Sequence, residues 1–313
     1  MARAATQGAL PAGRGVSWAR LRRATWNGER IDWSAYVFLL PFFIPFFLMT
    51  VGAILFGTYV SFTSWGIVGE PQWVGLDNYV QALKDPWVPK VWGNTLKYGL
   101  FVAPATTLVA LGFALFVNQR WRGCTIARTV FYAPNVVSVT VIGLVWVWML
   151  DTQFGLVNQY LGAFGVPNIP WLTNPDWALW GVGIASVWWD AGFAMVILLA
   201  GLQDIPQELR EAAAIDGANP VRVFWHVVAP LLRPALSLVL TLEVISTLRV
   251  FSQIYVMTNG GPAGATASVI QYVYQIGFSK YQLGYAAALS LMLFVTILIV
   301  TVVELRVFRE RNW

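Results

Sequence analysis

Six apolar stretches, each long enough to cross a lipid bilayer, constrain this chain more than any other feature of its sequence. They run over residues 34–62, 98–117, 130–150, 177–202, 236–257 and 283–303. About 20 mostly apolar residues cross the hydrocarbon core as a helix, and hydrocarbon offers the backbone no water, so each stretch is expected to be helical. Only 11% of the residues are charged, against roughly 25% in soluble proteins. The sequence therefore predicts an all-α polytopic membrane protein with six transmembrane helices. Four prolines within the stretches are expected to kink or locally widen their helices: Pro41, Pro45, Pro104 and Pro134.

Basic residues are distributed unevenly between the two sides of these stretches. Fifteen of the twenty Lys and Arg residues lie in four segments on one side of the stretches. These segments are the one before the first stretch, the loop between the second and third, the loop between the fourth and fifth, and the one after the sixth. Because cytoplasmic loops are enriched in Lys and Arg, both termini are expected to be cytoplasmic. The expected organisation is a cytoplasmic segment over 1–33, a transmembrane domain over 34–306 and a cytoplasmic tail over 307–313. The N-terminal segment lacks the apolar core of a cleaved signal peptide, and a transit peptide is the alternative to a basic anchor.

Reactive side chains are scarce. The single cysteine, Cys124, cannot form an internal disulfide, and the single histidine, His226, cannot build a metal site without carboxylates beside it. The sequence contains no phosphate-binding glycine loop and no nucleophile elbow. No catalytic or metal site is therefore expected, and the chain should not hydrolyse a nucleotide itself. The net charge of +5 is accounted for by the basic loops, so it indicates no nucleic-acid partner.

A charged, alanine-rich segment interrupts the apolar pattern between the fourth and fifth stretches. Asp204, followed by a proline, resembles a helix start, and Gly217 is the expected stop. Asn219 and Pro220 then predict a second short helix, which Pro230 is expected to end. Helices this short are marginal in water, so their stability must come mostly from packing.

The first of these short helices carries a shallow stripe of small residues with glutamates beside it. The stripe consists of Leu209, Ala212, Ala213 and Asp216. The glutamates beside it are Glu208 and Glu211. Two interpretations stay open: the loop caps its own bundle, or it docks onto a partner. The protruding glutamates favour docking, because a cap does not require them.

The residues of this loop resemble a known motif. They look like the EAA loop of permease subunits in binding-protein-dependent ABC importers. The positions that carry this resemblance are Glu211, Ala212, Ala213, Asp216, Gly217, Ala218, Phe224, Pro230, Leu231 and Pro234. Further stretches resemble the carbohydrate-importing branch of that family, of the maltose and glycerol phosphate class: GLDNY at 75–79, NTLKY at 94–98, RTVFYAPNV at 128–136, AGLQDIP at 200–206, TNGGP at 258–262 and LGYAAALS at 283–290. The likeness therefore extends over nearly the whole chain.

This resemblance implies a fold, a set of partners and a role for the loop. It implies the type I ABC importer permease fold, with cytoplasmic EAA coupling helices in a loop over 203–235. The implied partners are a second homologous permease, two copies of a cytoplasmic ATPase that bind ATP and Mg²⁺, an extracytoplasmic solute-binding protein, the lipid bilayer and a sugar. The resemblance places the glutamate matching Glu211 against a basic residue of the ATPase, and the chain in a bacterial or archaeal cytoplasmic membrane. No cofactor is expected in this chain, which acts as a transport subunit and not as an enzyme.

Charged residues inside the apolar stretches indicate a substrate pathway, because they are costly in a membrane. The candidate pathway residues on the fourth and fifth stretches are Trp189, Asp190, Phe193, Glu243, Ser246, Thr247 and Val250. Aromatic rings with carboxylates and hydroxyls suit a sugar. These positions match the family's transmembrane sugar site in place, although the best-known relative has no acid at Asp190 or Glu243. A third charged residue, Arg249, is expected to face a neighbouring helix or water.

Alternatives to this pathway also stay open. Asp190 and Glu243 could be structural, bonding to neighbouring helices or to the partner permease, or one of them could carry the proton of a secondary transporter. Within the importer hypothesis we expect a neutral di- or oligosaccharide. A cationic amino sugar is the alternative that two acids would suit, whereas a phosphorylated solute should favour more positive charge.

Overall fold

The computed structural model describes residues 33–66, 69–119 and 122–309. The expected N-terminal segment, apart from Trp33, and residues 310–313 of the expected tail lie outside the described residues. The chain divides into two units at Ile54. In the first unit, α2 (Trp33–Phe46) runs through Pro41 and Pro45 and leads directly into the π-helix η1 (Phe47–Val51) and the start of α3 (Gly52–Ser61). The first stretch is therefore helical and locally widened.

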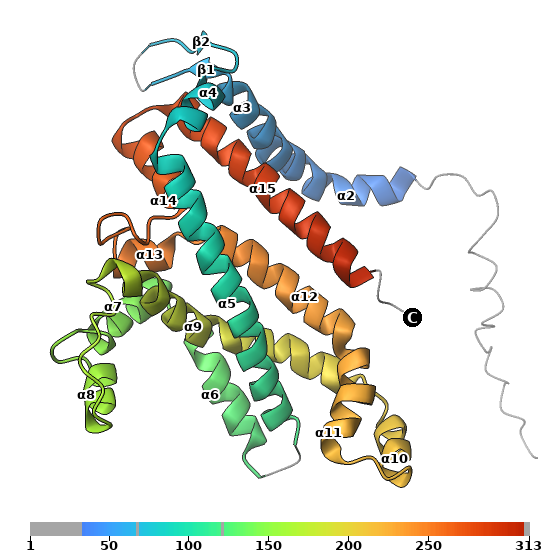
Figure 1. The fold of residues 1–313 in the computed structure, drawn as a ribbon. Helices are drawn as coiled ribbons and strands as arrows, with labels where there is room; N and C mark the ends of the chain where they lie inside the picture. The colour runs from blue at the N-terminus through green and yellow to red at the C-terminus, as the bar shows by residue number, and fades with distance from the viewer. Residues whose placement is uncertain (1–32, 67–68, 120–121, 310–313) are drawn as a thin grey trace, which may run out of the picture. The chain divides into compact units, whose positions relative to one another are not determined.

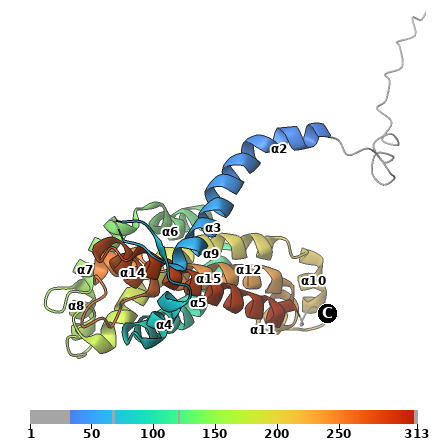
Figure 2. The same cartoon turned by 90° about the horizontal axis from the view of Figure 1, so that it is seen from above.

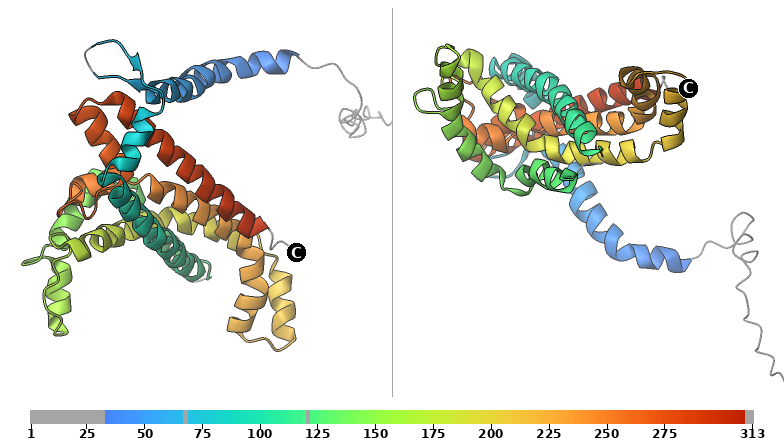
Figure 3. Two further views of the ribbon diagram at one scale, coloured as in Figure 1. Left: turned by 45° about the horizontal axis from the view of Figure 1, so that its top comes forward. Right: turned by 90° about the horizontal axis from the view of Figure 1, so that it is seen from below.

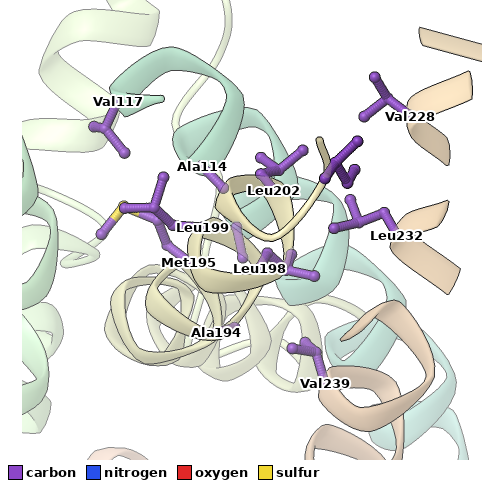
Figure 4. Close-up of a cluster of buried hydrophobic side chains, with 12 residues drawn as sticks. Ala114, Val117, Ala194, Met195, Leu198, Leu199, Leu202, Val228, Leu232 and Val239 are labelled. Atoms are coloured by element: carbon purple, nitrogen blue, oxygen red, sulfur yellow. The ribbon is translucent and has the colours of Figure 1, made fainter. Parts of the chain in front are cut away.

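Three long helices form the centre of the second unit. These are α5 (Trp87–Val117), α9 (Pro175–Gln203) and α12 (Ala229–Leu248), and each packs against the other two. Figure 4 shows one of the clusters that join them, in which Ala114 of α5, Leu198 of α9 and Leu232 of α12 meet, all at most 1% exposed. Small residues such as Ala114 let the helix backbones approach closely, as is usual in membrane helix packing. This packing brings the fourth and fifth stretches together.

The remaining elements of the second unit surround these helices. The long helix α15 (Leu283–Arg309) packs against α12, α14 (Val269–Tyr274), η3 (Gln275–Ser279) and α4 (Asp77–Lys84), as Figures 1 and 2 show. A two-residue antiparallel pair, β1 (Thr63–Ser64) and β2 (Gln72–Trp73), also contacts α15 through β1. The helix α8 (Leu156–Ala163) follows the third stretch. All the other regular elements of the described residues are helices, as the sequence predicts.

The expectation of one continuous helix over 130–150 is wrong. The stretch forms α6 (Cys124–Val136) and α7 (Val139–Met149), which are bent by 99° at a two-residue break. Val137 and the following serine have extended backbones. Pro134 removes one backbone donor near the end of α6, and the indole N–H of Trp189 on α9 donates to its carbonyl at 2.9 Å. The amide of Val137 donates to the same carbonyl at 3.1 Å, so the break is bonded both within itself and to α9.

The expectations for the fifth stretch are also corrected. Pro230 does not end the second short helix, because α11 (Pro220–Val223), the π-helix η2 (Phe224–Val228) and α12 form one span from Pro220 to Leu248. The amide of Ala229 donates to the carbonyl of Phe224 across a widened turn, which accommodates the proline ring that follows. The helix then ends at Leu248 and not at residue 257, since α13 (Ser252–Met257) is a separate element packed on α7. A single rigid helix therefore joins the charged loop to the membrane.

A carboxylate ties α4 and α5 to α14 and α15. The hydroxyls of Tyr272 and Tyr285 both donate to Oδ2 of Asp85, the second at 2.8 Å, and the amide of Trp87 donates to Oδ1 at 2.9 Å. Burial acts to raise the pKa of Asp85, whereas these hydrogen bonds and nearby Lys280 act to lower it. The lowering effects together are larger, so the pKa of Asp85 lies below the ordinary value of 3.8. Asp85 therefore binds the three donors as an anion.

Replacing Asp85 should produce a pH-dependent loss of stability. Since the pKa is lower in the folded than in the unfolded chain, the carboxylate stabilises the fold fully above its unfolded pKa, and this contribution is lost as the pH falls through the folded pKa. We expect Asp85→Asn to lower the free energy of unfolding by about 1–3 kcal/mol at pH 7 and by much less near pH 3. Thermal unfolding of the detergent-solubilised protein at both pH values measures this. The exposed Glu70, replaced by Gln, is the control, and an equal loss at both pH values would contradict the assignment.

Candidate functional site

The charged loop folds as two short helices at one end of the second unit. The first is α10 (Gln207–Ile215), which packs against α11 and η2, as Figure 3 shows. The expected cap by Asp204 is not formed, because Asp204 ends α9 and the residue that precedes α10 is Pro206, which makes no side-chain cap. The side chain of Gln207 instead donates to Oε1 of Glu211 at 2.6 Å. This bond holds the Glu211 carboxylate in one position on the helix surface.

The turn between α10 and α11 follows the expected chemistry. Gly217 has φ +79, and the amides of Gly217 and Ala218 donate to the carbonyls of Ala214 and Ala213. This pattern is a Schellman motif, which glycine favours because it has no Cβ to clash in the left-handed region. Asn219 then caps α11 by accepting from the amide of Arg222 at 2.8 Å. The turn therefore has one defined geometry.

The predicted coupling residues lie on an open surface. Four of them are exposed, namely Glu211, Ala212, Asp216 and Gly217, and the fifth, Ala213, is half-buried. Ile215, an apolar residue of the same helix, is 86% exposed. A loop that capped its own bundle would bury this side chain, so the exposure favours the docking interpretation.

Two arginines, one from α10 and one from α6, donate to carbonyls at the ends of membrane helices. Arg210 of α10 donates to the carbonyl of Leu202 at 2.7 Å, and Arg128 of α6 donates to the carbonyl of Val117 at 3.2 Å. These carbonyls lie in the last turns of α9 and α5, where no amide of the same helix satisfies them. Both arginines line one cavity of about 600 Å³ beside α10. Sequence reasoning did not single out either arginine.

A second cavity, of about 430 Å³, lies where the two helix breaks meet. Its described lining residues are Val139, Trp189, Leu242, Ile245, Ser246, Arg249, Val250, Phe251, Ser252 and Gln253. Val139 begins α7 after the first break, and Arg249 to Phe251 connect α12 to α13. The hydrogen bond to the Pro134 carbonyl fixes the Trp189 ring at this cavity. We refer to it as the break cavity.

The structure divides the seven predicted pathway residues into two groups. Trp189, Ser246 and Val250 line the break cavity, whereas Asp190, Phe193, Glu243 and Thr247 do not. Phe193 is 44% exposed on another part of α9, and Thr247 is buried at 3% exposure.

The two carboxyl groups belong to a polar cluster between α5, α9 and α12. Glu243 is 5% exposed, and its Oε2 has no hydrogen-bond partner among the described residues. Asp190 and Glu243 are close enough to interact electrostatically with each other and with the buried hydroxyl of Tyr98. That hydroxyl donates to Ser186 of α9 at 2.7 Å. The geometry favours the structural interpretation of Glu243 over contact with a ligand in the break cavity.

Arg249 also lines this cavity, where it is exposed. The sequence singles it out as a charge inside an apolar stretch and predicts that it faces a neighbouring helix or water, but it does not predict the cavity. The end of α12 at Leu248 could not be read from the apolar pattern, which continues to residue 257. Phe251 and Gln253 were missed for the same reason.

Comparison with known proteins gives consistent matches. The family described as "Binding-protein-dependent transport system inner membrane component" matches residues 106–309. The trehalose/maltose transport system permease of Thermococcus litoralis is 35% identical over 290 residues, which cover 88% of this chain and 94% of that protein. The sulfoquinovosyl glycerol transport system permease of Agrobacterium fabrum is 32% identical over 287 residues, covering 91% of this chain and 92% of that protein. The sn-glycerol-3-phosphate transport system permease of Escherichia coli is 32% identical over 283 residues, covering 88% and 94%.

Solved structures show the same fold. A bacterial ABC transporter involved in the import of the acidic polysaccharide alginate matches with a TM-score of 0.76 and 23% identity, over 95% of this chain and 99% of that chain. A complex of a bacterial alginate ABC transporter with an alginate pentasaccharide-bound periplasmic protein matches with a TM-score of 0.74 and 22% identity, over 92% and 95%. The type I permease fold expected from the sequence is thereby confirmed.

Proposed function

Because the chain belongs to the family of inner membrane components of binding-protein-dependent transport systems, we propose that it forms half of the sugar pathway of an ATP-driven importer. The chain is a permease subunit of the carbohydrate class and not an enzyme, and ATP hydrolysis belongs to separate subunits. The observation that carries the proposal is the exposed loop of α10 and α11, which continues without a stop into the membrane helix α12.

In this proposal, the loop couples the ATPase to the membrane. Two cytoplasmic ATPases bind ATP and Mg²⁺, and each closure of the pair moves the helices docked in their clefts. The Gln207 amide holds the Glu211 carboxylate for a basic residue of the ATPase. Because α11, η2 and α12 form one helix, displacement of the loop tilts α12 as a body and changes the side to which the pathway opens. The Arg210 bond to Leu202 transmits the same displacement to α9.

The break cavity is the part of this chain that we assign to the sugar. Trp189 presents a fixed aromatic ring, and Ser246, Ser252 and Gln253 supply hydroxyl and amide groups for hydrogen bonds. The cavity is open at one side, and we propose that a second, homologous permease closes it. Each permease then contributes half of the pathway.

The proposed orientation follows the distribution of basic residues. The chain spans the cytoplasmic membrane several times, with both termini and the coupling loop in the cytoplasm. The segments around the β1–β2 pair and α8 then lie outside and meet a solute-binding protein. An alginate ABC transporter with this fold was solved in complex with a periplasmic protein, which supports such a partner.

The proposed substrate is a di- or oligosaccharide. Relatives are described as carrying trehalose and maltose in one case and starch degradation products in another, and the alginate transporter imports an acidic polysaccharide. The names trehalose, maltose and alginate share a sugar with more than one unit, whereas two other relatives are named for sn-glycerol-3-phosphate and sulfoquinovosyl glycerol.

Uptake measurements with the reconstituted complex test the proposal. We expect proteoliposomes that contain this chain, its partner permease, both ATPases and the binding protein to accumulate an oligosaccharide only with ATP. Replacing the catalytic glutamate of the ATPase should abolish this uptake. Sugar uptake driven by a proton gradient after removal of the ATPases would instead support the proton-coupled alternative, which none of the comparisons supports.

A further inference from the structure

The charge of the break cavity indicates which sugars enter it. Among the described residues that line the cavity, Arg249 alone is charged, and Trp189 and Phe251 are its aromatic members. We infer that the cavity takes a sugar that carries an anionic group, a carboxylate, sulfonate or phosphate, and that Arg249 binds this group. The inference rests on the proposed function and replaces the neutral substrate expected from the sequence.

The position of Arg249 supports a ligand-binding role. It follows the last residue of α12, where its amide donates to the carbonyl of Ser246 at 3.1 Å, and its side chain is exposed at the cavity. The helix break therefore places an exposed arginine at the cavity. Arg249 lies directly after the last residue of the span Pro220–Leu248, so its charge is placed at the end of a membrane helix. A guanidinium group can bind a carboxylate, sulfonate or phosphate through two parallel hydrogen bonds.

The acids of the chain do not neutralise this arginine. Within the described residues, Arg249 forms no ion pair with a carboxylate. Glu243 lies six positions earlier, inside α12, and is buried at 5% exposure. Asp190 is next to Trp189 in sequence but does not line the cavity. Among the described residues, the lining of the cavity therefore carries one positive charge and no negative charge.

The aromatic residues complete a site for a charged sugar. The Trp189 ring is held by its bond to the Pro134 carbonyl, and Phe251 stacks on Tyr255 with ring centroids 5.3 Å apart and planes at 24°. Both rings are therefore fixed before a ligand arrives. Rigid aromatic faces cover the apolar faces of a pyranose, while Ser246 and Gln253 can bond its hydroxyls.

A binding experiment with charge-matched probes tests this inference. The complete permease–ATPase complex, without the binding protein, is placed in nanodiscs, and saturation-transfer NMR compares methyl glucoside with methyl glucuronide and with methyl glucoside carrying a 6-phosphate or a 6-sulfonate. We expect at least one anionic probe to bind about 10- to 100-fold more tightly than methyl glucoside, the range that a charge-assisted hydrogen bond provides. Arg249→Gln should remove this preference, and Arg249→Lys should retain part of it. Arg306→Gln, an exposed arginine near the end of α15, is the matched control and should keep it.

The outcomes separate the inference from its alternatives. The absence of a preference for every anionic probe, or a preference that survives Arg249→Gln, overturns it. If Arg249→Gln does not assemble, an Arg249→Lys protein with the full wild-type preference overturns it instead. If Arg249 binds lipid phosphate, Arg249→Gln will lower the unfolding temperature only in nanodiscs that contain phosphatidylglycerol and will leave the probe ratio unchanged, which also overturns it. ATP-driven uptake of a sugar without charge preference would defeat this inference but not the proposed function, whereas no uptake of any sugar would defeat the proposed function.

Discussion

Glu211→Ala is expected to reduce sugar uptake by at least about tenfold while the protein still inserts and folds. The carboxylate is exposed at the surface of α10 and accepts a hydrogen bond from Gln207. It therefore contributes little to the stability of this chain. A hydrogen bond between charged groups contributes about 1.5–3 kcal/mol. Its loss at the docking surface should therefore weaken the grip of the ATPase by about 10- to 100-fold, because 1.4 kcal/mol corresponds to a factor of ten. The loop then no longer follows the ATPase, and ATP hydrolysis becomes uncoupled from transport.

The measurement is the ratio of sugar transported to ATP hydrolysed in proteoliposomes, together with the unfolding temperature of the purified complex. Glu70→Ala is the control, because Glu70 is an exposed glutamate outside the charged loop. Glu211→Gln distinguishes charge from hydrogen bonding at the site itself. If Glu211→Ala transports sugar with the wild-type ratio, α10 does not dock through this carboxylate, and the coupling role assigned to the loop fails at that residue.

Gly192→Ala is expected to disrupt the membrane domain itself. A Cβ atom at Gly192 of α9 would clash with the carbonyl oxygen of Phe131, a backbone atom of α6 that cannot move away as a side chain does. The two helices must separate, and the bond from Trp189 to the Pro134 carbonyl is then lost. Overpacking costs about 1–3 kcal/mol, and more where the backbone is the obstacle. The expected result is a low yield of folded protein and a lower unfolding temperature.

Gly112→Ala provides the control for this substitution. Gly112 lies inside the membrane helix α5, and a Cβ there meets nothing within 4 Å. Alanine is favoured over glycine inside a helix by about 1 kcal/mol, so this variant should be neutral or slightly stabilised. Size-exclusion chromatography of the detergent extract and thermal unfolding compare the two. Equal behaviour of both variants would mean that α6 and α9 do not approach this closely.

Much of this protein was determined by its sequence alone. The length of the apolar stretches requires membrane helices, since backbone groups in hydrocarbon must bond within their own segment. The Schellman turn at Gly217 and the cap at Asn219 were predictable because they depend on neighbours in sequence. The EAA residues identified the loop and, with the other motifs, the family. These features are local, so a sequence specifies them directly.

Only the tertiary structure decided which polar residues share a cavity. At the breaks after Val136 and Leu248, other parts of the fold hydrogen-bond to the backbone. The indole of Trp189, for example, donates to the carbonyl of Pro134, and such partners lie far away in the sequence. Because α12 ends at Leu248, Arg249 lines the cavity in the segment that follows, while Glu243 inside α12 does not line the cavity and is buried. Hydropathy treats both as charges in one apolar stretch. The direction of a side chain follows from the helix phase and from its neighbours in space, and hydropathy records neither.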